Sequence, residues 1–94
     1  MMTRSEILET ATQYVTQDRA ATHGDAEDNF GRIAALWDAY LDGEARITAV
    51  DVAVMMTLLK IARIVTNEGH ADNWIDACGY MACGGEIATG DRHD

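Results

Sequence analysis

The segment from Thr48 to Thr66 constrains the fold of this chain most, because it is apolar on nearly every side when wound as a helix. About eighteen residues is far too long for a buried strand. Thr48 and Asp51 stand three residues apart, which is the spacing of a helix N-terminal cap. A helix that is apolar on all sides is usually buried on all sides. We therefore expect this helix to be the central element of the domain or of a dimer.

Two helices are predicted before this segment from apolar residues at helical spacing. The first begins at Thr3 or Ser5, since Thr3 and Glu6 have the spacing of a capping box. The second follows Asp25, a suitable N-cap, and ends near residues 42–44, Asp-Gly-Glu. Its apolar stripe comprises Phe30, Ile33, Ala34, Trp37, Tyr40 and Leu41.

A last helix is predicted to start at Asp72 or Asn73 and to end before Gly90. Three glycines within it, Gly79, Gly84 and Gly85, reduce helix propensity, and close packing against another helix is the expected compensation. The chain contains no proline and little of the turn punctuation typical of β-sandwiches. The predicted fold is all-α: a compact four-helix bundle in one domain over residues 1–94.

Composition narrows the classes of partner. The 94 residues have a formal net charge of −9, which disfavours duplex nucleic acid and anionic membranes. A chain this short buries only about 60–65% of its unfolded surface, so a homo-oligomer is expected. Cys78 and Cys83 fit neither a disulfide framework nor a zinc motif, and no secretory or membrane-spanning segment is evident. We expect a cytoplasmic protein with reduced cysteines.

Polar residues interrupt the apolar background at two places. On the helix over 48–66, Lys60 and Arg63 share one side. If this helix and the last one form an antiparallel hairpin, Arg63 falls level with Asp76 and Lys60 level with Tyr80. Buried cations require an anion. Either Asp76 neutralises one of them, with Tyr80 as a hydrogen-bond partner, or both cations bind a phosphate while Asp76 orients them or helps to hold a metal.

The second place is the entry to the helix after Asp25. Arg19, His23 and Gly24 precede free backbone N–H groups at a helix N-terminus, an arrangement that suits an anion. An ordinary helix entry, with Asp25 as the cap, explains the same residues. The oxygen ligands that Mg²⁺ or Mn²⁺ prefer are offered by Asp25, Glu27 and Asp28.

Six blocks of the sequence together resemble a known family. They are Thr22-His23-Gly24-Asp25, Asn29-Phe30, Ile33-Ala34-Ala35-Leu36-Trp37, Asp51-Val52-Ala53-Val54-Met55-Met56, Leu58-Leu59-Lys60-Ile61-Ala62-Arg63, and Asp72-Asn73-Trp74-Ile75-Asp76-Ala77-Cys78-Gly79-Tyr80. In this order they resemble a family of small phage and prophage proteins, domain of unknown function 6378. The resemblance covers nearly the whole chain and implies no particular activity.

A more distant similarity is to the all-α nucleotide pyrophosphatases of the MazG type. Those enzymes hold Mg²⁺ over a nucleoside triphosphate with an E-E-x-x-E helix and an E-x-x-D helix. Here the second motif is represented by Asn73-Trp74-Ile75-Asp76, with Asn in place of Glu, and in the first Gly31 takes the place of an acid. The similarity implies a MazG-like outline and a nucleotide ligand.

Three functional hypotheses follow. The favoured one is a nucleotide-binding or phosphate-binding protein, extended to metal-dependent hydrolysis with Asp25 and Asp76 as catalytic residues on Mg²⁺, Mn²⁺ or a water. In the second, a phage protein sequesters a nucleotide signal against host defence without turnover. In the third, the apolar helix is buried in a homo-oligomer and the ion pairs are structural. All three place the protein in the cytoplasm of the bacterial host.

Overall fold

The structure, a computed structural model, describes residues 1–18 and 25–90. Over these residues it contains the helices α1 (Arg4–Gln13), α3 (Ala26–Tyr40), α4 (Ala49–Thr66) and α5 (Ala71–Thr89), and a short π-helix, η1 (Tyr14–Asp18). No strand occurs in this part of the chain. The prediction of an all-α fold with four helices packed together is confirmed. None of these helices combines the length and the apolarity needed to cross a bilayer.

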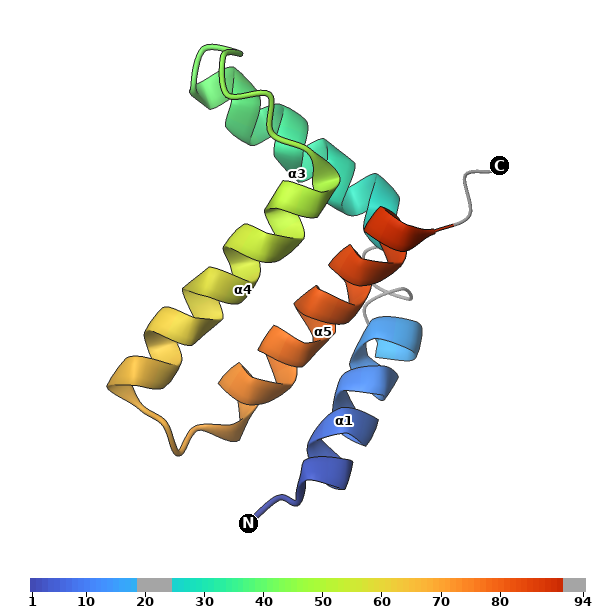
Figure 1. Ribbon diagram of the computed structural model, residues 1–94, viewed down its shortest axis with the longest axis vertical. Coiled ribbons are helices and arrows are strands. Elements are labelled where there is room, and N and C mark those ends of the chain that lie inside the picture. The colour runs from blue at the N-terminus through green and yellow to red at the C-terminus, as the bar shows by residue number, and fades with distance from the viewer. Residues whose placement is uncertain (19–24, 91–94) are drawn as a thin grey trace.

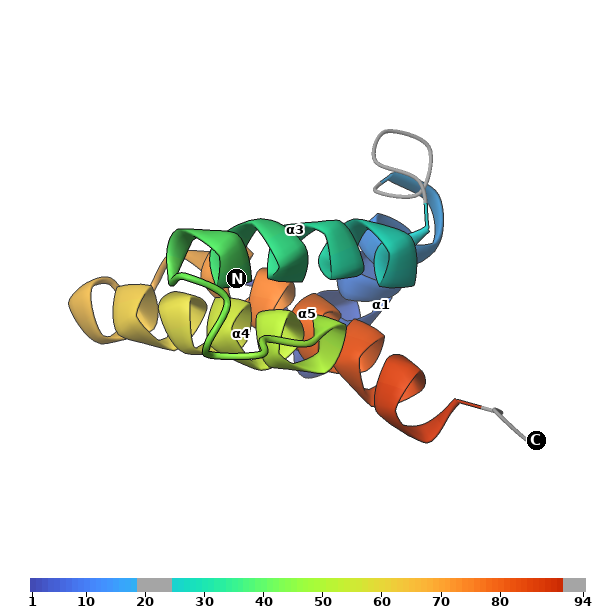
Figure 2. The same ribbon diagram turned by 90° about the horizontal axis from the view of Figure 1, so that it is seen from above.

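The centre of the fold is a hairpin of α4 and α5, which lie side by side and antiparallel (Figure 1). Helix α1 packs against α5 on the side away from α4. Helix α3 crosses the end of the hairpin at which α4 begins and α5 ends, and Figure 2 shows it as a layer above both. Helix α5 is therefore covered by α4 on one side and by α1 on the other, whereas α4 is covered by α5 along its length and by α3 only at its beginning.

Side-chain caps set the helix starts as predicted. Thr3 forms a capping box with Glu6, and Thr48 forms one with Asp51, each side chain bonding the other's backbone N–H. Helix α4 has the predicted bounds. The predicted start of α5, Asp72 or Asn73, is late by one or two residues, since α5 begins at Ala71 after His70, which makes no side-chain cap bond.

The capping box of α4 yields a testable expectation. Thr48→Ala removes the hydroxyl that accepts from Asp51 N at 3.1 Å, leaving an unsatisfied donor at the start of the longest apolar helix. Urea denaturation should show a loss of about 1 kcal/mol in the free energy of unfolding. Thr48→Ser retains the hydroxyl and should stay close to wild type. Equal losses in both variants would contradict the capping role.

The core lies where α3, α4 and α5 meet. Its buried residues are Phe30, Ala34, Val52, Ala53 and Ile87. The predicted stripe of α3 is confirmed for its first part, with Ile33 and Trp37 packed against this core. It is wrong for its last turn, where Tyr40 is 86% exposed and Leu41 48% exposed. Helix α3 extends beyond the end of the hairpin, so nothing in the described chain covers that turn (Figure 1).

Two glycines of α5 permit close packing, as predicted. A Cβ atom built on Gly84 would lie 2.7 Å from Cβ of Ala53 on α4, and one on Gly79 would lie 3.1 Å from Cγ1 of Val15 on η1. Gly85 faces open space, so the prediction is wrong for this residue. Helix α5 thus approaches α4 through one glycine and η1 through another.

The expectation that α4 is buried on every side is wrong within one chain. One side of α4 packs on α5, and α3 covers only its beginning, so the opposite side is open. We call this side the outer α4 face. It comprises Val54, Met55, Leu58, Ile61, Ala62 and Val65, all of them exposed.

Candidate functional site

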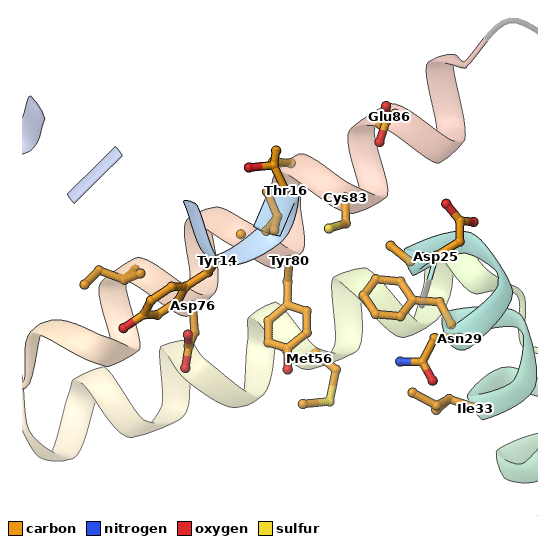
Figure 3. A pocket seen from close by; sticks show the side chains of 16 residues that line it. Tyr14, Thr16, Asp25, Asn29, Ile33, Met56, Asp76, Tyr80, Cys83 and Glu86 are labelled. Carbon is orange, nitrogen blue, oxygen red and sulfur yellow. The ribbon is translucent and has the colours of Figure 1, made fainter. Parts of the chain in front are cut away.

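A pocket of about 550 Å³ lies between η1, α3 and α5 (Figure 3). Its walls are mainly apolar and aromatic, with a few polar side chains among them. The π-helix contributes Tyr14, Val15 and Thr16; α3 and its cap contribute Asp25, Ala26, Asn29, Phe30 and Ile33; α4 contributes Met56; and α5 contributes Ile75, Asp76, Gly79, Tyr80, Ala82, Cys83 and Glu86.

The local structure explains why these segments converge. Tyr14 to Thr16 form a π-helical stretch, a type of turn that is rare and frequent at functional sites. Gly79 lets this stretch approach α5, because a side chain there would press on Val15. Asp25 stands at the beginning of α3 as its N-cap. The pocket is therefore bounded by a wide turn, a helix start and the middle of α5.

Aromatic rings form part of the wall. The ring centroids of Phe30 and Tyr80 are 6.0 Å apart, and the ring planes are tilted by 36°. Tyr14 approaches from the opposite side, on η1 (Figure 3). Aromatic surfaces of this kind offer stacking to a flat ring.

Carboxylates stand at both ends of the pocket. In Figure 3, Asp25 and Glu86 lie toward one end and Asp76 toward the other. The carboxylate of Asp25 accepts from the backbone N–H groups of Glu27 and Asp28, at 3.1 and 3.3 Å. Two of the N-terminal donors of α3 are thus already used by the Asp25 side chain.

Lys60 and Asp76 form an ion pair across the hairpin. Lys60 Nζ lies 2.9 Å from Asp76 Oδ2, and the two side chains are only 13% and 14% exposed. Of the two interpretations drawn from the sequence, neutralisation of a cation by Asp76 describes this geometry. Lys60 itself does not line the pocket, while Asp76 and Tyr80 do.

The predicted register of the hairpin is wrong by about one turn. Asp76 is level with Lys60, and Arg63 is exposed and outside the pocket. The connection between the helices occupies only residues 67–70. Residues equally far from it face each other, and Lys60 lies six residues before the end of α4 while Asp76 lies five after the start of α5.

The remaining predicted residues are not gathered into one site. Glu27 and Asp28 are exposed on the first turn of α3 and do not line the pocket. Arg19, His23 and Gly24 lie outside the described residues. Within residues 1–18 and 25–90, no group of three or more His, Cys, Asp or Glu side chains is arranged to hold a metal ion. The carboxylates that line the pocket are those of Asp25, Asp76 and Glu86.

Several pocket residues were not singled out from the sequence. Tyr14 belonged to the apolar face predicted for the first helix, and Asn29 lies next to Phe30 in the stripe of the second. Glu86 carries the clearest signal in retrospect, because it is the one charged residue between Gly79 and Thr89. Because Glu86 is exposed and Asp72 and Asp76 lie on the same helix, this signal alone does not assign Glu86 to a pocket.

Fold and site together define an all-helical domain with a partly polar pocket beside a helical hairpin. Residues 6–88 match the family described as Domain of unknown function (DUF6378). The chain belongs to this family, as its sequence blocks predicted.

Its relatives come from phages. The chain is 50% identical over 74 residues to the Gene 55 protein of Mycobacterium phage L5. The matched residues make up 79% of this chain and 47% of that protein. It is 39% identical over 77 residues to the Gene 55 protein of Mycobacterium phage D29, covering 82% of this chain and 50% of that protein. The chain thus spans about half the length of these relatives. No solved structure matches it, so the similarity to MazG-type enzymes stays a prediction from the sequence.

Proposed function

We propose that this phage-family domain binds a nucleotide, with the nucleoside part in the pocket between η1, α3 and α5. The observation that carries the proposal is the pocket itself. Its volume of about 550 Å³ falls within the range of small-molecule sites, and its walls combine apolar surface with a few polar groups.

The chemistry of the walls favours a flat, polar-edged ligand. The partly exposed rings of Tyr80 and Tyr14 offer faces on which a base can stack, and the buried ring of Phe30 supports Tyr80. The amide of Asn29 both donates and accepts hydrogen bonds, and the carboxylates accept from N–H and O–H groups. A base edge and ribose hydroxyls present these groups.

The same carboxylates oppose a bare phosphate chain. Asp25, Asp76 and Glu86 bring negative charge to the pocket, and Lys60 is engaged by Asp76. A polyphosphate therefore needs a divalent cation, which proteins commonly bind through one or two carboxylates together with the phosphates and waters. On this basis nucleosides bind without metal, whereas nucleoside triphosphates bind only with Mg²⁺ or Mn²⁺.

The test is a thermal-shift panel of nucleosides and nucleotides with and without Mg²⁺ or Mn²⁺, followed by calorimetric titration of any ligand that raises Tm. Asn29→Ala should weaken the affinity for that ligand about tenfold by removing a hydrogen-bonding partner. Glu44→Ala, on the exposed connection before α4, is the control and should bind like wild type. If no nucleoside or nucleotide shifts the melting of the wild type, the proposal is wrong.

Two further experiments test where the phosphate of a nucleotide binds and whether the ligand is hydrolysed. The sequence-based hypothesis puts the phosphate on Lys60 and Arg63. Arg63 is exposed, so Arg63→Ala leaves the fold intact and weakens nucleotides but not nucleosides if that hypothesis is right. Chromatography of the ligand after incubation with Mn²⁺ distinguishes a hydrolase from a sequestering protein, since the latter returns it unchanged.

A further inference from the structure

We propose that the outer α4 face is the contact surface of a homodimer, covered by the same face of a second copy of this chain. The six side chains of this face lie within about 120° of arc at 100° per residue. None of them is charged, and Val54, Met55, Leu58, Ile61 and Val65 are between 42% and 83% exposed. Monomeric proteins rarely leave a continuous apolar patch of this kind in water.

The chain exposes more surface than a compact monomer of its mass. Its accessible surface is 6539 Å², whereas a compact monomer of this mass exposes about 5,400 Å². The outer α4 face contributes to this excess, and a standard interface takes roughly 800 Å² from each partner. The radius of gyration, 14.2 Å, is likewise larger than the roughly 12 Å of a compact domain of this length.

The spacing along α4 suits a second copy in particular. Val54, Leu58, Ile61 and Val65 are separated by four, three and four residues, the repeat of a helix-pairing seam. This order is the same from either end of the helix. Two copies related by a twofold axis and running antiparallel therefore match Val54 with Val65 and Leu58 with Ile61, as an isologous interface requires.

The dimer surface is separate from the ligand pocket. The only α4 residue in the pocket lining is Met56, which at 100° per residue lies on the side of α4 opposite the outer α4 face. Dimerisation thus leaves the pocket open, and the two proposals stand or fall independently.

The experiment is sedimentation equilibrium of the chain over a range of micromolar concentrations. The wild type should sediment at twice its monomer mass of 10.3 kDa. Leu58→Glu places a charge in the seam and should weaken association at least about 100-fold. Leu8→Glu is the matched control, because Leu8 on α1 is 58% exposed and Leu58 is 57% exposed, yet α1 lies on the far side of α5. It should remain dimeric.

Mixing two oppositely charged variants of Leu58 distinguishes a variant that has lost the interface from one that has lost its fold. Leu58→Glu and Leu58→Lys should each be monomeric and helical by circular dichroism, and an equal mixture should recover the dimer mass. A monomeric wild type at all concentrations, or a Leu58→Glu variant that stays dimeric, would overturn the proposal. The first outcome would leave the face to a different protein partner, and the second would place the interface elsewhere on the chain.

Discussion

Gly84→Ala is expected to lower the free energy of unfolding by about 2–3 kcal/mol, although alanine is the better helix former. The new methyl group would lie 2.7 Å from Cβ of Ala53, a distance that Cβ atoms do not adopt. Both atoms are buried, with Ala53 at 0% exposure in the middle of the core. Helices α4 and α5 would have to move apart along their whole contact, which loosens the core at Val52 as well.

The neighbouring glycine provides the matched control. Gly85 is exposed, and a methyl group added there would meet no atom within 4 Å, so Gly85→Ala gains helix propensity without a clash. It should raise the stability by about 0.5–1 kcal/mol. Urea denaturation at one fixed protein concentration measures both variants. Ala53→Gly combined with Gly84→Ala should restore part of the loss. If Gly84→Ala is as stable as Gly85→Ala, then α4 and α5 do not approach each other at Gly84 as closely as the structure shows.

These two glycines show where sequence reasoning succeeds and where it stops. A glycine in a helix indicates close packing only when another element faces it, and the sequence does not say which side of α5 is faced. The starts of α1 and α4 are local, since the Thr3 and Thr48 caps need only residues three positions away, and they were predicted correctly. The all-helical fold follows from such local signals together with apolar spacing.

The register and the burial of α4 depend on information that is not local. The pairing of Lys60 with Asp76 is set by the length of the connection between α4 and α5, and one residue of error in a helix start changes which side chains meet. Burial of α4 depends on what covers its outer face, and no part of residues 1–18 and 25–90 does so. The pocket arises where η1, α3 and α5 converge, so Asn29 and Glu86 acquire their surroundings only in three dimensions.

Asp76→Leu is expected to cost about 2–3 kcal/mol of stability, because it leaves the ammonium of Lys60 largely buried without its counter-ion. Lys60 is 13% exposed and lies 2.9 Å from the Asp76 carboxylate. Lys60→Met should cost less, about 1–2 kcal/mol, since Asp76 also has an interaction besides the one with Lys60. The double variant, Lys60→Met with Asp76→Leu, removes both charges and should come within about 1 kcal/mol of wild type. Urea denaturation of the four proteins forms a double-mutant cycle that isolates the pair.

The cycle also decides what Lys60 does for a ligand. If the ion pair is structural, Lys60→Met melts at a lower temperature than wild type, and nucleotides still raise its Tm by the same increment. If Lys60 instead binds phosphate, Lys60→Met loses little stability. Nucleoside triphosphates then no longer raise its Tm, whereas nucleosides still do. The partial burial of both side chains and their direct contact favour the first outcome. Asp76 then has two tasks, neutralising a cation from α4 and forming one polar end of the pocket, so its replacement should reduce ligand affinity as well as stability.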